Sequence, residues 1–218
     1  MNLRDYVISK IKEEKLIAIV RGVAPDKCLQ IAQALYDGGF RLMEITFDQS
    51  APETFRQTAE AIRAVSDAFE GRMEIGAGTV LSVELVELAA KAGAKYIISP
   101  DTIPSVIKRS RELGLVSIPG ALSPTEVTTA YNCGADFIKL FPVSNLGVSY
   151  VKALRAPLSH IDMLAVGGVN EDNLKSYLDA GLCGAGIGGN LVNKAWVAAG
   201  EYEKITEAAK AYIKIVKE

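Results

Sequence analysis

The sequence has no long apolar run, no excess of charge of either sign, and few cysteines. None of its 218 residues lies in an apolar stretch near the roughly 18 residues that a membrane-spanning helix needs. The 24 basic and 26 acidic side chains give a net charge of −2, which implies no general attraction to nucleic acid or to anionic membranes. The amino-terminal residues mix charged and apolar side chains at helical spacing instead of forming a signal core. We therefore expect a cytoplasmic protein.

Residues that commonly hold metals or nucleotides are also scarce. Cys28, Cys133 and Cys183 lie far apart and show no metal-ligand or disulfide spacing, so we expect reduced, packed thiols and no metal site. The single histidine, His160, lies in a polar turn, which favours a surface position over a catalytic one. No Gly-x-Gly-x-x-Gly motif follows the first predicted strand, which argues against dinucleotide binding.

Short apolar segments alternate with amphipathic segments along the whole chain. The apolar segments predict eight strands, at 16–20, 42–46, 73–75, 96–99, 116–118, 137–141, 163–166 and 184–187. The amphipathic segments predict crossover helices at 26–36, 52–66, 82–91, 103–113, 124–132, 150–154 and 171–180. Several of these helices end in a glycine just before the next strand, where a left-handed turn favours glycine, as at Gly39, Gly93, Gly114, Gly134 and Gly181.

This alternation predicts an α/β fold with a parallel sheet. Eight units close into a (β/α)8 TIM barrel, here preceded by an amino-terminal helix, and an open doubly wound sheet is the alternative. The chain shows no linker and no shift in composition, so we expect residues 1–218 to form one domain. In a barrel, reactive groups gather at the carboxyl ends of the strands.

One lysine interrupts the otherwise apolar strand predicted at 137–141. Because side chains alternate along a strand, Phe137, Lys139 and Phe141 share one face, which places the amine between two aromatic rings. Removing an ammonium from water lowers its pKa, and the neutral amine can then attack a carbonyl to form an imine. The alternative is a lysine that extends from the strand end into solvent.

The second predicted strand places Glu44 and Thr46 on the same face as Leu42. A carboxylate in such an apolar layer is costly unless it is paired, and its raised pKa would suit proton transfer near neutral pH. The alternative is an ion pair with Lys139 or Arg21 that serves only the core. Arg21 itself ends the first strand, where it can hold a substrate carboxylate bidentately or be an ordinary surface arginine.

Two glycine-rich turns follow the seventh and eighth predicted strands. The first is Val166-Gly167-Gly168-Val169-Asn170, and the second is Gly186-Ile187-Gly188-Gly189-Asn190, followed by a short predicted helix start at Leu191 and Val192. Backbone amides at such turns and at a helix start can hold an anion, and barrels often bind phosphate at this pair of loops. Each turn alone is ordinary, but together they predict a phosphate site.

Seven motifs stand in an order that resembles one known family over most of the chain. They are Val20-Arg21-Gly22-Val23, Glu44-Ile45-Thr46, Ile75-Gly76-Ala77-Gly78-Thr79-Val80, Ser99-Pro100, Pro119-Gly120 with Pro124-Thr125-Glu126, Phe137-Ile138-Lys139-Leu140-Phe141-Pro142, and Gly167-Gly168-Val169. The family is that of the class I KDPG/KHG aldolases, which cleave 2-keto-3-deoxy-6-phosphogluconate (KDPG), its galactonate epimer and 4-hydroxy-2-oxoglutarate (KHG). Each motif is weak alone, and the ordered set is specific.

The resemblance implies a carbon–carbon lyase of sugar-acid metabolism, such as the Entner–Doudoroff route, that releases pyruvate and an aldehyde such as glyceraldehyde 3-phosphate. It implies that Lys139 forms the imine and that Glu44 is the general acid and base, without a metal or an organic cofactor. It also implies a homotrimer whose only other partner is a small phosphorylated keto acid. Together with the candidates above, the expected substrate-binding residues are Arg21, Thr46, Thr79, Pro100, Phe141, Val166, Gly167, Gly168, Gly188, Gly189 and Asn190.

The chain departs from the family pattern at three positions. Asp48 stands where many gluconate-type relatives have an arginine for the substrate carboxylate, and relatives without it commonly carry an Arg-Gly pair like Arg21-Gly22. Gly189 replaces a phosphate-binding serine, which leaves backbone amides and Asn190 for the phosphate. Val166 precedes the glycine pair where the gluconate type has threonine, as in galactonate-type members. The alternative function is a non-catalytic phosphosugar-binding barrel, or an isomerase without imine chemistry.

Overall fold

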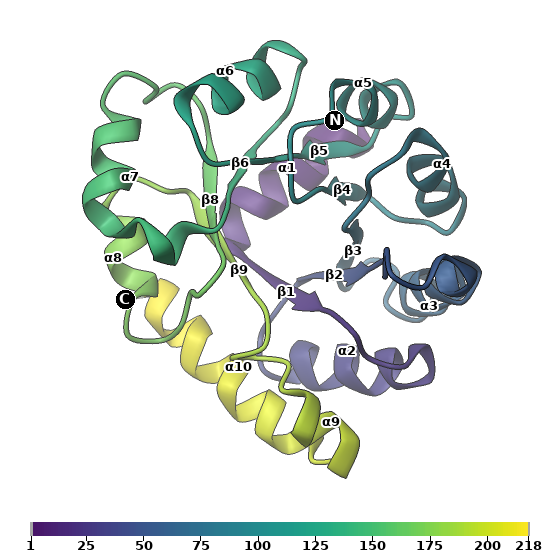
Figure 1. Ribbon diagram of the computed structural model, residues 1–218. Coiled ribbons are helices and arrows are strands. Elements are labelled where there is room, and N and C mark those ends of the chain that lie inside the picture. The colour runs from purple at the N-terminus through teal and green to yellow at the C-terminus, as the bar shows by residue number, and fades with distance from the viewer. Residues whose placement is uncertain (1, 218) are drawn as a thin grey trace.

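In the computed structural model, which describes residues 2–217, the strands form one parallel sheet that curls into a nearly closed barrel (Figure 1). The order in the sheet is β5-β4-β3-β2-β1-β9-β8-β7-β6, so the first strand pairs with both the second and the last. The strands are β1 (Leu16–Val20), β2 (Leu42–Thr46), β3 (Glu74–Gly78), β4 (Tyr96–Ile98), β5 (Val116–Ile118), β6 (Gly120–Ala121), β7 (Ile138–Leu140), β8 (Met163–Val166) and β9 (Gly184–Ile187). The open doubly wound alternative is wrong.

Helices cover the outside of this barrel and one of its ends. They are α1 (Leu3–Glu14), α2 (Cys28–Asp37), α3 (Phe55–Ala68), α4 (Val83–Lys91), α5 (Pro104–Glu112), α6 (Pro124–Asn132), α7 (Gly147–Arg155), α8 (Leu174–Asp179), α9 (Lys194–Ala199) and α10 (Tyr202–Lys217), with short 3-10 turns η1 (Pro25–Lys27), η2 (Pro52–Thr54) and η3 (Val143–Asn145). The sequence reasoning anticipated α1 to α8, placed a helix start near α9 at the wrong residues, and did not anticipate α10.

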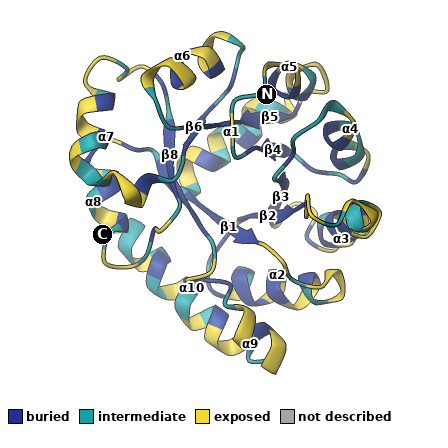
Figure 2. Ribbon diagram, in the orientation of Figure 1, coloured by how far each residue is buried: buried dark blue, intermediate teal, exposed yellow. Residues whose placement is uncertain are grey.

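The strands are apolar because both of their faces are covered. Every residue of β1 is buried, since one face meets the barrel interior and the other meets the helices (Figure 2). A larger apolar cluster fills the layer between sheet and helices, and a smaller one fills the barrel interior. Alternation along each strand therefore decides which side chains can reach the interior.

The predicted glycine ends of the helices are confirmed. The five glycines have positive φ angles, which a residue with a Cβ adopts only with strain; the angles are 101° at Gly39, 94° at Gly93, 73° at Gly114, 98° at Gly134 and 94° at Gly181. At the other end of α6, Ser123 and Glu126 form a capping box that satisfies backbone amides of the first turn.

The described residues contain nine strands where eight were predicted, because a short strand, β6, follows β5 after Pro119. The fifth strand predicted at 116–118 is present as β5, and Pro119, which has no amide hydrogen to donate, separates it from β6. β5 pairs with β4, and β6 pairs with β7. The carbonyl of Pro119 accepts a hydrogen bond from the amide of Lys139 at 2.9 Å, so the residue between β5 and β6 is bonded directly to β7.

The helix start predicted at Leu191 and Val192 is wrong. Both residues lie in a turn, and both of their amides donate to the carbonyl of Gly188 at 2.9 Å. Their side chains are buried in the outer apolar cluster. The helix begins at Lys194 instead, where the side chain of Asn193 accepts a hydrogen bond from the amide of Ala195.

Helix α1 closes the end of the barrel at which the strands begin. It leads directly into β1, and its residues Val7 and Ile11 belong to the apolar cluster of the barrel interior. Figure 1 shows α1 lying behind the strands, across the barrel. One end of the barrel is therefore filled with apolar side chains, and chemistry is left to the opposite end.

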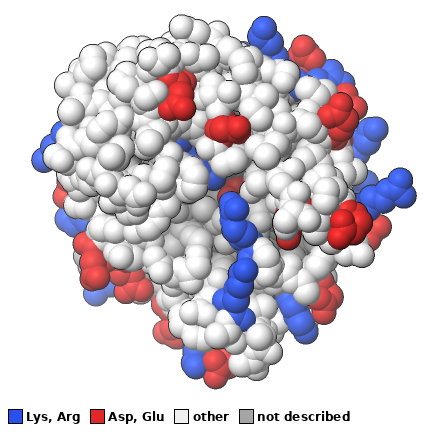
Figure 3. All heavy atoms as spheres, in the orientation of Figure 1, with Lys and Arg blue, Asp and Glu red and all other residues white. Residues whose placement is uncertain are grey.

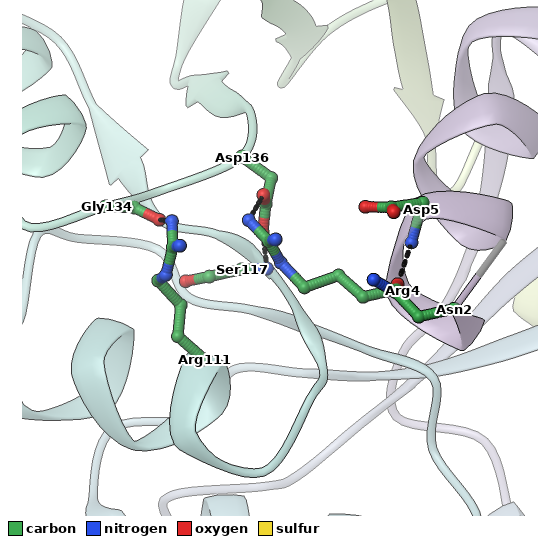
Figure 4. A network of polar contacts seen from close by, with 7 residues as sticks. All are labelled: Asn2, Arg4, Asp5, Arg111, Ser117, Gly134 and Asp136. Carbon is green, nitrogen blue, oxygen red and sulfur yellow. Dashed lines mark hydrogen bonds and ion pairs between the residues drawn. The ribbon is translucent and has the colours of Figure 1, made fainter.

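A charged contact fastens α1 to the barrel (Figure 4). The guanidinium of Arg4 pairs with the carboxylate of Asp136, whose side chain is only 4% exposed. The same carboxylate accepts a hydrogen bond from the amide of Ser117 at 2.9 Å. Asp136 thus joins α1, β5 and the start of β7, the strand that carries Lys139.

Replacing Asp136 by alanine should lower the free energy of unfolding by about 2–4 kcal/mol, because it leaves a partly buried guanidinium and a backbone amide without their partner. Chemical denaturation measures this difference. The matched control is Asp162→Ala, which removes the exposed ion pair with Lys12 and should cost less than about 1 kcal/mol. Equal losses for the two variants would contradict a special role for Asp136.

Candidate active site

Lys139 lies inside the barrel near the carboxyl end of β7. It is 2% exposed, so the alternative of a lysine that extends into solvent is wrong. Its Nζ lies 4.9 Å from the ring centroid of Phe141, and Phe137 belongs to the same interior cluster. Burial lowers the pKa of Lys139 below its ordinary value; the negative charge of Glu44 opposes this shift, and the positive charge of Arg21 adds to it. Burial and the charge of Arg21 therefore both favour a neutral, reactive amine.

Glu44 is the second ionisable side chain inside the barrel. It is 0% exposed, and neither of its carboxylate oxygens has a hydrogen-bond partner among residues 2–217. Burial raises the pKa of Glu44, while the charges of Lys139 and Arg21 lower it in part. The alternative of a structural ion pair is not supported, because such a pair would occupy at least one of these oxygens.

The space for Glu44 is created by glycines on the neighbouring strand. Glu44 pairs in register with Gly76, and Gly76 pairs with Tyr96, so the three positions form one row across β2, β3 and β4. A Cβ at position 76 would lie 2.1 Å from the Tyr96 ring, and one at Gly78 would lie 2.7 Å from Oε2 of Glu44. The glycines of the Ile75-to-Val80 motif therefore admit a carboxylate and an aromatic ring to the interior.

Lys139 and Glu44 face the same small space. Both line an interior cavity of about 10 Å³, together with apolar side chains and Gly186. A cavity of this size holds about one water molecule. The two groups are not hydrogen-bonded to each other, so a proton passes between them through one water, while the surrounding apolar layer keeps bulk solvent out.

A larger cavity of about 480 Å³ opens above this pair at the carboxyl ends of the strands. It brings together most of the residues that the sequence singled out; these are Arg21, Lys139, Phe141, Val166, Gly167, Gly168, Gly188, Gly189 and Asn190. Figure 3 shows a hollow near the centre of this face with basic side chains along its edge. The cavity is deep enough to expose Lys139 to a small molecule and wide enough for a six-carbon acid.

Three predicted substrate-binding residues do not line this cavity, and Glu44 lines only the smaller one. A Cβ at Gly78 would contact both the Glu44 carboxylate and Cγ2 of Thr46, so Thr46 lies beside Glu44. The backbone of Pro100 lies so close to Gly120 that a Cβ at position 120 would collide with it. Thr79 contacts the cavity wall indirectly, through Arg21. Thr46 and Pro100 thus support the neighbours of the reactive pair.

Arg21 is held at the cavity edge by Thr79. Its Nη2 donates to Oγ1 of Thr79 at 3.2 Å, and Nε2 of Gln49 donates to the Thr79 carbonyl at 2.8 Å. Thr79 has a φ angle of 57°, a strained conformation for a β-branched residue. A strained loop that positions a guanidinium next to a buried lysine is typical of a site that binds an anion.

The two glycine turns form the neighbouring wall, since they follow β8 and β9, and β9 pairs with β1. Gly167 and Gly168 have φ angles of 92° and 75°, and a Cβ at Gly168 would lie 2.2 Å from Oγ of Ser144. In the described residues, the amides of Gly189 and Asn190 make no hydrogen bond, so both are available to an anion. The side chain of Asn190 is partly committed, because its Nδ2 donates to the carbonyl of Val169 at 2.9 Å and links the two turns. Its expected role at the phosphate is therefore shared with a structural one.

The sequence reasoning missed three residues of the cavity wall. Ile19 lies two residues before Arg21 on β1, and Gly186 lies two residues before Gly188, so strand alternation alone assigns both to the interior. The third is Val169, which closes the first glycine turn. These residues add shape and no chemistry.

The remaining expectations concern residues away from the cavity. Cys28, Cys133 and Cys183 are free thiols, and His160 is exposed, stacked edge-on against Tyr131. Among residues 2–217, no group of three or more His, Cys, Asp or Glu side chains is placed to hold a metal ion. Within the same range, every helix is too short or too polar to cross a membrane.

Comparison with known proteins identifies one family. A family model described as KDPG and KHG aldolase matches residues 7–208. The chain is 39% identical over 204 residues to 2-dehydro-3-deoxy-6-phosphogalactonate aldolase of Escherichia coli (strain K12), covering 93% of this chain and 95% of that protein. It is 30% identical over 211 residues to 2-dehydro-3-deoxy-phosphogluconate aldolase of Treponema pallidum (strain Nichols), covering 96% and 97%.

A solved structure agrees with these relatives. The structure described as native KDPGal is 38% identical and superposes with a TM-score of 0.84, over 93% of this chain and 94% of that chain. The similarity therefore includes both the fold and the strands that carry Lys139 and Glu44.

The buried pair should reduce stability. Replacing Glu44 and Lys139 together by methionine should raise the free energy of unfolding by about 1–4 kcal/mol, because two desolvated ionisable groups are exchanged for apolar side chains of similar length. Urea denaturation at neutral pH measures the change. The control is Thr46→Val on the same strand, which leaves both ionisable groups in place. A double variant less stable than the parent would show that the two groups stabilise the core.

Proposed function

The chain belongs to the KDPG and KHG aldolase family, and we propose that it cleaves 2-keto-3-deoxy-6-phospho sugar acids to pyruvate and glyceraldehyde 3-phosphate through an imine on Lys139. It is thus a carbon–carbon lyase of the aldolase type. The proposed substrates are KDPG and its galactonate epimer, with 4-hydroxy-2-oxoglutarate as a further candidate.

The observation that carries this proposal is the burial of one lysine beside one unpaired carboxylate at the base of an open cavity. A desolvated amine is a nucleophile at neutral pH, and a desolvated carboxyl group with a raised pKa both accepts and returns protons. A barrel that only binds phosphosugars, or an isomerase without imine chemistry, has no need for a buried amine. Family membership favours the lyase over both alternatives.

In the first step, the neutral amine of Lys139 adds to the C2 ketone of the substrate, and loss of water with uptake of one proton, which the final hydrolysis releases again, gives a protonated imine. The imine withdraws electrons from C3. Glu44, directly or through the one-water cavity it shares with Lys139, accepts the proton of the C4 hydroxyl. The C3–C4 bond then breaks, and its electron pair enters the imine to form an enamine.

In the second step, the aldehyde leaves and Glu44 returns its proton to C3 of the enamine. This restores the imine, now of pyruvate, and hydrolysis frees pyruvate and the amine of Lys139. The ring of Phe141 beside Nζ shields the imine from bulk water. Every proton that leaves the substrate is returned, so the cycle closes with these two residues.

The two charged ends of the substrate fit the two walls of the cavity. The carboxylate at C1 belongs near the guanidinium of Arg21, which is held by Thr79. The phosphate belongs at the neighbouring wall after β8 and β9, where the amides of Gly189 and Asn190 are free and the backbone of Gly167 and Gly168 turns sharply. Position 48, an exposed aspartate, stays outside this arrangement, since its Oδ1 accepts hydrogen bonds from Ser50.

We propose that β5 and β6 together count as one strand of the barrel, which would make it a (β/α)8 barrel. The support is that Pro119 alone separates the two strands and that its carbonyl bonds to β7. We also propose that residues 1–218 form one domain. By family resemblance we also propose a homotrimer in the cytoplasm.

Borohydride reduction in the presence of pyruvate tests the imine. It should add a three-carbon group irreversibly to Lys139, because only an imine is reduced to a stable amine. The rate should rise with pH and level off below the ordinary lysine value of 10.5, since the pKa of Lys139 is lowered. Digestion and mass spectrometry locate the adduct.

Two variants complete this test. Lys139→Met should give no adduct, and Glu44→Gln should still give it while turnover falls by roughly a hundredfold or more. An unmodified Lys139 in the parent protein would overturn the proposal. Turnover of Glu44→Gln within a few-fold of the parent would show that Glu44 is structural.

Discrimination at C4 should be loose. Val166 lines both cavities and presents methyl groups where a hydroxyl would be needed to contact the C4 hydroxyl, and one neutral hydrogen bond contributes only about 1 kcal/mol. The specificity constants for the gluconate and galactonate epimers should therefore lie within about two orders of magnitude of each other. Val166→Thr should shift the preference toward the gluconate epimer, with Val166→Ala as the matched control. Strict selectivity that neither variant moves would place C4 recognition elsewhere.

A further inference from the structure

Lys194 lies beside the residue that follows Arg21, a residue of the cavity wall, although sequence reasoning assigned it no role. It is the first residue of α9, and its Nζ lies 2.6 Å from the point that a Cβ of Gly22 would occupy. Gly22 has a φ angle of 60° and directly follows Arg21. The ammonium of Lys194 therefore rests on the backbone beside the guanidinium of Arg21, in space that only a glycine leaves open.

This ammonium has no counter-ion in the described part of the chain. Its side chain makes no ion pair within 4.0 Å and no hydrogen bond there, unlike Lys204 and Lys210 farther along the chain. The nearby carboxylate of Asp48 is engaged by Ser50, whose hydrogen bonds lower the pKa of Asp48, with a further lowering from the charges of Lys194 and Arg21. Three donor hydrogens of Lys194 thus remain available.

The position of Lys194 joins the two walls of the cavity. Arg21 forms one wall, and the turn at Gly188, Gly189 and Asn190 forms the other. The chain runs from that turn through two buried residues to Lys194, which reaches back to Gly22. Figure 3 shows basic side chains in a line from the central hollow toward the side where Figure 1 labels α9. Lys194 therefore links the chain after β9, which offers the free amides, to the loop after β1, which carries Arg21.

Uncharged backbone amides alone distinguish poorly between a phosphate and a hydroxyl at the far end of a substrate. A phosphate monoester carries close to two negative charges at neutral pH, so a mobile cation at the rim adds an attraction that a hydroxyl does not receive. Arg21 cannot supply it fully if it holds the carboxylate at C1. Among residues 2–217 the cavity wall itself contains only Arg21 and Lys139 as cations, and Lys194 is a further cation placed directly beside the Arg21-Gly22 backbone.

We infer that Lys194 is a specificity-determining residue that contacts the distal phosphate of the substrate and selects phosphorylated over unphosphorylated aldehydes. This inference rests on the proposed function, since it assumes that the aldehyde half of the substrate occupies the wall at Gly188 to Asn190. In this inference the lysine side chain recognises the charge of the phosphate, which the uncharged amides of the glycine turn do not.

The test measures aldol addition of pyruvate to glyceraldehyde 3-phosphate and to glyceraldehyde. In Lys194→Met, the ratio of kcat/KM for the phosphorylated aldehyde to that for the unphosphorylated one should fall roughly ten- to a hundredfold, as expected for a lost charge-assisted hydrogen bond. Lys194→Arg should keep the ratio within a few-fold of the parent. Added salt should weaken the selectivity of the parent and leave that of Lys194→Met nearly unchanged.

The control variant is Lys108→Met on α5, which removes an exposed lysine away from the cavity and should leave the ratio at the parent value. A ratio that is unchanged in Lys194→Met, or an equal loss for both aldehydes, would overturn the inference. Pyruvate trapping on Lys139 in Lys194→Met separates this from the proposed function, because that reaction involves no aldehyde. A parent protein that traps no pyruvate would defeat the proposed function instead.

Discussion

Desolvation of two ionisable side chains is the constraint on which the rest of this structure depends. Lys139 and Glu44 lie in the apolar interior of the barrel, where neither is exposed by more than 2% and the carboxylate has no hydrogen bond among the described residues. Water would stabilise both charges, and its exclusion shifts both pKa values toward neutrality. The surrounding sheet has to be stable enough to hold them there. The exclusion of water therefore makes these two side chains reactive and also makes their burial costly in free energy.

The two ends of the barrel divide the tasks of stability and chemistry. Helix α1 closes the amino end with Val7 and Ile11 and is fastened by Arg4 to the buried Asp136. That carboxylate also bonds to the amide of Ser117, so the anchor reaches β5 and the strand that carries Lys139. The carboxyl end stays open, and its loops supply Arg21 and the two glycine turns. Rigid strands thus position the buried pair, while the loops form the wall of the cavity above it.

Several glycines contribute to the site because they have no side chain. At Gly76 and Gly78 a Cβ would collide with Tyr96 and with Glu44, so the absent side chains form the space for an aromatic ring and a carboxylate. At Gly22 the omission leaves room for the ammonium of Lys194. The same residue type at Gly39 or Gly181 only ends a helix. Close approach of a functional group distinguishes the two uses.

The sequence by itself determined the alternation of strands and helices, the glycines that end the helices, and the face on which Glu44 and Lys139 lie, because periodicity and backbone preference act locally. It also carried the ordered motifs of the aldolase family. Only the tertiary structure decided that these two side chains share one cavity, that the Glu44 carboxylate is unpaired, and that Thr46 and Pro100 stand behind the cavity wall. The additional strand β6 after Pro119, the start of α9 at Lys194 and the placement of Lys194 on Gly22 likewise became visible only in three dimensions. Each of these depends on contacts between residues far apart in the chain, which no local pattern encodes.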